Sequence, residues 1–505
     1  MDSEKKPRSI SEMSFGMSDG KNEARQANFE SLFYNGGGYY NKLKNDSLKF
    51  LVIGRKGTGK TILVRYFRKQ LSKENNTFTK FIVAGDFTNE KLNTFDYVSV
   101  REEEREIFWR YVILKELASL VLNEEKGFLS RKWISKLREL DQELTFNLEE
   151  LIQENEDSFK AGLNSKGPTA EAGDRSKKVS KYKPASYFAK VQKLTNILMD
   201  VMKRSKRRYF LFFDDLDEIK LSSIQNTEGE DNVTTLAKLL NDFVSALSYI
   251  NDKLLDLESG SRVISTLRQD VVKQMQFYGN NINKVVTDNG IKITWFSPMI
   301  TRTPQNTELG KLVIHKIKAS VADYQTLDDK KLFDIIFPRT RGKSNPFKFI
   351  VDRGFGRPRD VIRYLDIVQE KFPDSQSINY NLVHQVQGEY CSWFYSELQN
   401  EINILENSQS IVESLNLIKK NGNIIFSFDE VSEMLEQNFN DFSDIKDLKS
   451  DLKSLFVLGA IGNYERKDDK KAPIIEYSYR DGTDNPDFSK KFKVHPALRN
   501  YLSMG

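Results

Sequence analysis

Residues 50–61 read FLVIGRKGTGKT, an apolar segment that runs directly into the pattern G-x-x-x-x-G-K-[ST]. In this pattern, glycines let backbone N–H groups face a polyphosphate, the lysine reaches the β- and γ-phosphates, and the last hydroxyl can ligate Mg²⁺. Residues 48–53 predict a strand and residues 62–71 an amphipathic helix, whose positive end faces the same anion. The stretch therefore predicts a nucleotide-binding loop between a strand and a helix.

The contacts to this nucleotide should come from the loop and the start of the following helix. Among them, we expect Lys60 to act in catalysis through its charge and Thr61 to hold the metal. The full set of expected contacts is Gly54, Arg55, Lys56, Gly57, Thr58, Gly59, Lys60, Thr61 and Ile62.

The composition is that of a globular chain, with 505 residues of which 39% are hydrophobic and 30% charged. The 77 basic and 72 acidic residues nearly balance, at +5, which neither requires nor excludes nucleic acid. A single cysteine and three scattered histidines argue against a disulfide within the chain and against a zinc centre. No apolar run reaches the length of a membrane span, and we expect a cytoplasmic protein without a membrane contact.

Strands alternate with helices after the loop, which predicts an α/β fold with a doubly wound parallel sheet. The chain turns helical beyond residue 303, and a hairpin within residues 460–482 suggests a C-terminal winged helix. Further strands are expected at 80–84, 209–213, 262–266 and 292–296. The expected domains are a flexible N-terminus at 1–27, a P-loop ATPase core at 28–302 with a helical insertion at 123–184, a helical lid at 303–403 and a winged-helix domain at 404–505.

A second acidic motif follows the strand at residues 209–213, in the stretch YFLFFDDLD. A carboxylate at the end of such a strand can hold Mg²⁺, and its neighbour can polarise an attacking water. We assign Asp214 to the metal and Asp215 to the base. Asp217 and Glu218 are alternatives, although they also suit the cap of the next element.

Four further residues could contact the nucleotide. Thr266 and Arg268, at the end of the strand STLR, could sense the γ-phosphate, or Arg268 could simply begin a helix. Arg359, in GFGRPRD at residues 354–360, could reach over the nucleotide, or the motif could be a tight turn between helices. His495, in KVHPAL, could be functional, although a single histidine is more often structural.

In this order, the motifs GRKGTGKT, FLFFDDLD, STLR, GRPRD and VHPAL resemble those of the STAND/AAA+-related signalling ATPases. The nearer likeness is to uncharacterised bacterial KAP-like P-loop ATPases, and the more distant one to NB-ARC switches and origin-recognition ATPases. The resemblance implies that Arg268 is a sensor arginine, that Pro358 packs on adenine, that Arg359 is a second sensor and that His495 touches ADP. Pro496 departs from the pattern, because NB-ARC proteins often carry Asp there.

These motifs favour an ATP- and Mg²⁺-dependent molecular switch that controls self-assembly or a separate effector protein. By resemblance alone, anti-phage defence is a suitable setting. The alternative is a DNA-binding ATPase of replication, transposition or repair, with DNA held by a winged-helix hairpin that carries Arg466, Lys467, Lys470 and Lys471. A scaffold that binds nucleotide without hydrolysis is a third hypothesis. The motif does not distinguish ATP from GTP.

Overall fold

The computed structural model divides the chain into two compact units. Residues 39–55 and 63–293 form one, here called the sheet unit, and residues 1–38, 56–62 and 294–505 form the other, here called the helical unit. The structure describes residues 7–83, 102–124, 132, 134–140, 142, 184–216, 232–278, 282–297, 303–403, 405, 407–466 and 473–504.

A parallel five-stranded sheet organises the sheet unit, with the strand order β2-β3-β4-β1-β5. The predicted parallel sheet is therefore confirmed. The last strand is shorter than the expected segment 292–296 and begins earlier. The strands are β1 (Leu51–Gly54), β2 (Thr77–Val83), β3 (Arg208–Asp214), β4 (Arg262–Arg268) and β5 (Gly290–Lys292).

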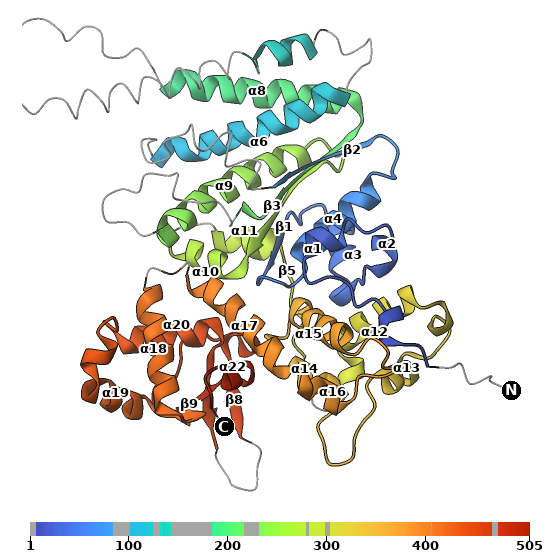
Figure 1. The fold of residues 1–505 in the computed structure, drawn as a ribbon. Coiled ribbons are helices and arrows are strands. Elements are labelled where there is room, and N and C mark those ends of the chain that lie inside the picture. The colour runs from blue at the N-terminus through green and yellow to red at the C-terminus, as the bar shows by residue number, and fades with distance from the viewer. Residues whose placement is uncertain are drawn as a thin grey trace, which may run out of the picture. The chain divides into compact units, whose positions relative to one another are not determined.

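Helices cover both faces of this sheet, as the continuous apolar strand β3 requires. Side chains alternate along a strand, so Phe210 and Phe212 share one face, where both contact Phe67 of α4. Phe213 points to the other face and contacts Phe243 of α9. Figure 1 shows α6 and α8 packed side by side. The main helices of this unit are α3 (Tyr39–Asn45), α4 (Lys60–Leu71), α6 (Glu102–Glu124), α8 (Pro184–Ser205), α9 (Asn232–Leu255), α10 (Gln269–Tyr278) and α11 (Ile282–Asn289).

The helical unit contains the segments predicted as lid and C-terminal domain, and they share one apolar core. The expected boundary between residues 403 and 404 therefore does not separate two cores. The lid helices are α12 (Glu308–Ser320), α13 (Asp329–Ile336), α14 (Pro346–Val351), α15 (Pro358–Lys371), α16 (Tyr380–Gln385) and α17 (Gln387–Ile402).

The C-terminal segment places three helices before most of a small antiparallel sheet of order β6-β9-β7-β8. Its core residues, such as Leu452 and Phe492, are completely buried. The elements are α18 (Ser408–Asn421), β6 (Ile425–Phe426), α19 (Phe428–Gln437), α20 (Leu448–Leu458), β7 (Ile461–Glu465), β8 (Ile474–Glu476), α21 (Ser478–Asp481), β9 (Lys491–Val494) and α22 (Pro496–Tyr501).

The N-terminal segment corrects one expectation, because residues 7–27 are folded rather than flexible. Ile10, Met13 and Phe15 are buried in the core of the lid helices. Glu23 lies in the short helix α1 (Gly20–Glu23), and its carboxylate pairs with the buried Lys316 of α12 at 2.5 Å. The segment is mostly polar, which is why the sequence predicted a flexible terminus. Its few apolar residues pack against residues some 300 positions further along the chain.

Several expectations lie outside the described residues. They concern most of the insertion at 123–184 and the hairpin residues Lys467, Lys470 and Lys471, together with Asp217 and Glu218. Among the helices that the structure describes, none combines the length and apolar character needed to cross a membrane.

Candidate nucleotide site

The loop between β1 and α4 has the backbone of a phosphate cradle. Its glycines Gly57 and Gly59 have φ angles of 80° and 88°, which side chains other than glycine rarely adopt. Helix α4 begins at Lys60, so the positive end of its dipole faces the loop, where it would favour an anion. The strand–loop–helix order predicted from the sequence is confirmed.

The other residues expected to contact the nucleotide lie at the end of β1, in the loop and in the first turn of α4. Gly54 ends β1, and Arg55 follows it with a partly buried side chain. Lys60 is 8% exposed, while Thr61 and Ile62 are partly buried in the first turn of α4. A glycine cradle, a lysine and a hydroxyl at a helix start suit a polyphosphate with a magnesium ion.

A buried arginine of the lid forms a hydrogen bond with the backbone of the loop. Arg357 directly precedes α15 and is 2% exposed. Its guanidinium donates to the Lys56 carbonyl at 3.0 Å, to both carboxylate oxygens of Asp360, and to Glu401 of α17 at 3.3 Å. Burial alone would lower the pKa of Arg357, but the charges of Asp360 and Glu401 outweigh it and raise that pKa. The arginine therefore stays charged and fixes the loop backbone to two lid helices.

Arg359, which the sequence predicts to contact the nucleotide, lies against the loop. Its backbone N–H donates to the Gly57 carbonyl at 3.4 Å, and a Cβ added at Gly57 would lie 2.9 Å from the Arg359 Cβ. The guanidinium is held by Glu397 of α17, with Nη1 at 3.0 Å and Nη2 at 3.2 Å from its two oxygens. Lys56 Nζ lies 3.8 Å from the same carboxylate.

An apolar slot adjoins the loop. The Trp295 indole N–H donates to the Thr58 carbonyl at 2.9 Å, which places the ring beside the cradle. Pro358, the expected adenine contact, is buried as the first residue of α15. The slot has an internal volume of only about 10 Å³, so a purine would need it to widen. Its lining comprises Trp295, Phe296, Ser297, Thr307, Leu309, Val351 and Gly356.

The sheet unit brings the two carboxylates and Thr266 together at the carboxyl end of its strands. Asp214 ends β3 and is completely buried, and the Thr266 hydroxyl donates to its Oδ1 at 2.6 Å. The same hydroxyl oxygen accepts from the Asp215 N–H at 3.3 Å. Asp215 has a φ of 58°, a left-handed backbone that costs about 1–3 kcal/mol and tends to occur at functional sites. Thr266 therefore positions both acids, and its contact with a phosphate stays a prediction.

Arg268 is the last residue of β4 and pairs in register with Gly54, so it stands where the loop leaves the sheet. Its side chain is 13% exposed and pairs with Asp270, with Nη2 and Oδ2 2.5 Å apart. Asp270 lies in the first turn of α10. Arg268 therefore ends the strand and also anchors the start of the following helix, which agrees with the second of the two alternatives that the sequence left open. Its sensing of a phosphate stays a prediction.

His495 is enclosed by aromatic rings. It is completely buried, its ring stacks on Phe394 at 5.0 Å with an angle of 7° between the planes, and the Phe355 ring lies 5.3 Å away. Its Nδ1 accepts from the Ala497 N–H at the start of α22. Burial lowers the pKa of His495 to about 3, so the ring is neutral. This is the packing role, and the contact with ADP stays a prediction that needs the ring to become accessible.

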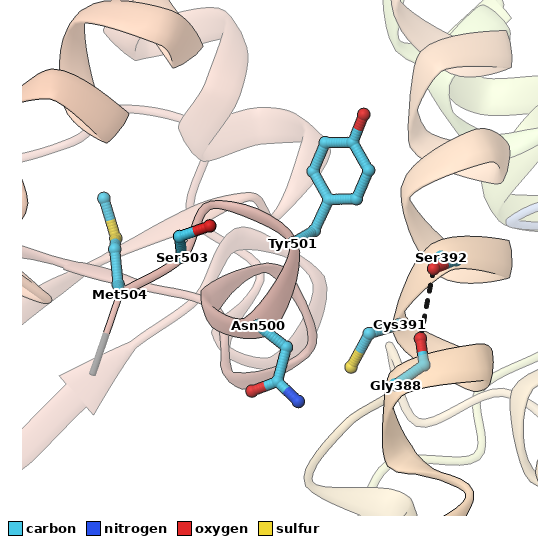
Figure 2. Close-up of a pocket in the computed structure, with 7 residues that line it drawn as sticks. All are labelled: Gly388, Cys391, Ser392, Asn500, Tyr501, Ser503 and Met504. Atoms are coloured by element: carbon cyan, nitrogen blue, oxygen red, sulfur yellow. Dashed lines mark hydrogen bonds between the residues drawn. The ribbon is translucent and has the colours of Figure 1, made fainter.

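A separate cleft of about 640 Å³ lies between α17 and the C-terminal helix α22 (Figure 2). Burial raises the pKa of the Cys391 thiol to about 11, so the thiol is protonated near neutral pH. No charged side chain is among the residues that line this cleft. It is therefore unsuited to a polyphosphate. The lining is Gly388, Cys391, Ser392, Asn500, Tyr501, Ser503 and Met504.

Sequence reasoning missed three charged residues around the loop, namely Arg357, Glu397 and Glu401. Arg357 had a local signal, because an acid three residues later on a helix start can pair with it. The two glutamates had none, because they lie some 340 residues from the loop and α17 reads as an ordinary amphipathic helix.

Comparisons with known proteins give a match to a family model and likenesses to solved structures. Residues 307–399 match the model of the FunZ-associated C-terminal helical domain, a segment that contains Arg357, Arg359 and Glu397. The chain is also similar to the crystal structure of Cdc6p from Pyrobaculum aerophilum, at 11% identity and a TM-score of 0.28, over 90% of this chain and 86% of that one. No curated protein matches the sequence.

Proposed function

We propose that this protein binds ATP with Mg²⁺ at the loop of residues 54–61, hydrolyses it, and uses the cycle as a molecular switch. The observation that carries the proposal is the loop itself, with left-handed glycines at a helix start and two lid arginines against its backbone. Lid contacts made directly to a phosphate cradle offer a physical route from nucleotide to conformation.

Each side chain has a role in this proposal. Lys60 supplies positive charge to the transferred phosphoryl group, while Thr61 and Asp214 offer the oxygen ligands that Mg²⁺ prefers. The ion would neutralise phosphate charge. Asp215 orients the attacking water, and its strained backbone supports that assignment. Arg268, at the carboxyl end of the central strand β4, would stabilise the charge that develops during transfer.

The finer assignment, to STAND- and KAP-like switches with a self-assembling or separate-effector output, rests on the sequence motifs. The anti-phage setting rests on that resemblance alone. The lid match to a FunZ-associated domain is compatible with such a family and specifies no partner.

A DNA-binding ATPase is the second candidate. The order α18, β6, α19, α20 and then β7, β8 and β9 supports a winged-helix interpretation of the C-terminal segment. Lys446, Lys449 and Lys453 are exposed on or beside α20 and could meet a phosphate backbone. Asp444 and Asp447 are exposed nearby and weaken that surface. This favours the switch over the DNA-binding reading.

The test is ATP hydrolysis by the full chain, with and without duplex DNA. Lys60→Ala should abolish most turnover and weaken ATP binding, because it removes a charge-assisted phosphate contact worth about 1.5–3 kcal/mol. Lys330→Ala, an exposed lysine of α13, is the charge-matched control and should behave as the wild type. Full hydrolysis by Lys60→Ala would refute the site, and strong stimulation by DNA would favour the second candidate.

A further inference from the structure

A carboxylate on α17 faces two cations of the nucleotide site. Glu397 is 13% exposed and pairs with Arg359 through both of its oxygens, at 3.0 and 3.2 Å. Its Oε2 also lies 3.8 Å from Lys56 Nζ. One acid therefore neutralises a cation of the lid and a cation of the loop.

The same two cations suit a polyphosphate. Lys56 is 32% exposed and belongs to the loop, and Arg359 lies against Gly57. Among the described residues, the buried Arg359 Nε has no hydrogen-bond acceptor, and Glu397 holds the guanidinium through Nη1 and Nη2. A carboxylate and a phosphate cannot both hold these groups at full strength, because each is an anion that needs the same N–H donors.

A second acid on the same face of α17, Glu401, forms an ion pair that is more deeply buried than the Glu397 pair. Glu401 follows Glu397 by four residues, so the two side chains project from one side of α17. Glu401 contacts Arg357, which is 2% exposed and already bound by Asp360, and this anchor excludes solvent. Arg359 is 22% exposed, and Glu397 is its ion-pair partner in the described chain. The Glu397 pair is therefore the exchangeable one.

We propose that Glu397 is a latch that competes with nucleotide phosphate for Lys56 and Arg359, lowering nucleotide affinity and tying phosphate binding to the position of α17. This inference rests on the proposed function. Glu397 acts through the two cations and is a positioning residue rather than a catalytic one. Removing its charge should free both cations for phosphate.

The experiment measures the dissociation constants of ATP, ADP and adenosine for the full chain by titration calorimetry. Glu397→Gln should lower the Kd of ATP about tenfold, equivalent to about 1.4 kcal/mol, with a smaller gain for ADP. Adenosine affinity should not change, because adenosine has no phosphate to compete. A merely structural role would not separate ligands by their phosphates.

The matched control is Glu389→Gln on the same helix, an exposed acid that pairs with Lys371 at 2.8 Å. It makes the same change in net charge and should leave all three constants unchanged. Should Glu397→Gln fail to fold, Glu397→Asp keeps the charge but withdraws the carboxylate, and it should tighten ATP binding severalfold. In the variant Glu397→Gln with Arg359→Ala, most of the gain should disappear.

Unchanged or weakened ATP binding in the Glu397 variant that folds, or an equal gain for adenosine, would overturn the latch. The proposed function fails separately. If the wild type does not bind ATP and Lys60→Ala matches it, the nucleotide site is wrong. If the wild type binds ATP through Lys60 and Glu397→Gln changes nothing, only the latch is wrong.

Discussion

Replacing His495 by Asn should remove a pH dependence from the stability of the helical unit. The ring is completely buried against Phe394 and Phe355, and burial lowers the pKa of His495 to about 3 from its ordinary value of 6.5. The folded state therefore keeps the ring neutral, while the unfolded chain takes up a proton below about pH 6.5. Asn can still accept a hydrogen bond from the Ala497 N–H but does not titrate.

The sign follows from these two pKa values. Because the folded pKa is the lower one, the contribution of His495 to stability is complete above about pH 6.5 and is lost progressively as the pH falls toward about 3. Between about pH 7 and pH 5, the unfolded state gains about 2 kcal/mol relative to the folded state from this one group. The wild type should lose that amount relative to His495→Asn over the same interval.

The single cysteine of the chain supplies a local assay. Cys391 lies on α17 in the same core and is 1% exposed, so a thiol reagent labels it only when this region opens. Its labelling by a pyridyl disulfide across a urea series, at both pH values, gives the free energy of opening. Comparing the variant with the wild type at each pH cancels the intrinsic pH dependence of the thiol and of other groups, such as the partly buried carboxyl of Asp366, whose pKa burial raises to about 7.

If the free energy of opening differs between the wild type and His495→Asn by the same amount at both pH values, His495 is not a buried, neutral histidine in the folded state. His495→Asn could instead release ADP faster, without any change in the pH dependence of stability. In that case, the contact with the nucleotide implied by the family resemblance would replace the packing role.

Three further outcomes are expected. Thr266→Val should cost about 1–3 kcal/mol and depress ATP hydrolysis, because it takes a donor from the buried carboxylate of Asp214; normal unfolding and turnover together would contradict this. Asp215→Asn should retain Mg-ATP in a binding titration yet lose most hydrolysis, and wild-type turnover would disprove its role as the base. Glu23→Gln leaves a buried lysine without its charged partner, so it should cost about 3–5 kcal/mol and raise hydrogen exchange across residues 8–24; unchanged exchange would count against a fixed N-terminal segment.

The parts of the structure that could be predicted depend on neighbours in sequence. The loop at 54–61 carries its glycines, lysine and helix start within eight residues, and Asp214 follows directly on an apolar strand. In both cases, the backbone that positions the residue is encoded beside it. The sequence therefore located the loop and the acidic pair without reference to the rest of the chain.

The parts that could not be predicted depend on distant partners. Residues 8–15 contain few apolar side chains, and only the lid helices make Ile10 and Phe15 core residues. Glu397 has no local feature that separates it from Glu389, an exposed acid two turns earlier on the same helix. Tertiary contacts alone decide which of these acids meets the loop.

The two arginines of GRPRD differ in burial and in their carboxylate partners, because their tertiary contacts differ. Arg357 is 2% exposed and has two carboxylate partners, so removing its contacts would leave charges stranded in the core, at a cost of several kcal/mol. Arg359 is 22% exposed, and its ion-pair partner among the described residues, Glu397, also lies 3.8 Å from Lys56 Nζ. If the latch proposal holds, an entering phosphate would displace the Arg359 contact while Arg357 keeps the loop backbone in place. One arginine would then fix the loop to the lid, and the other would respond to the ligand.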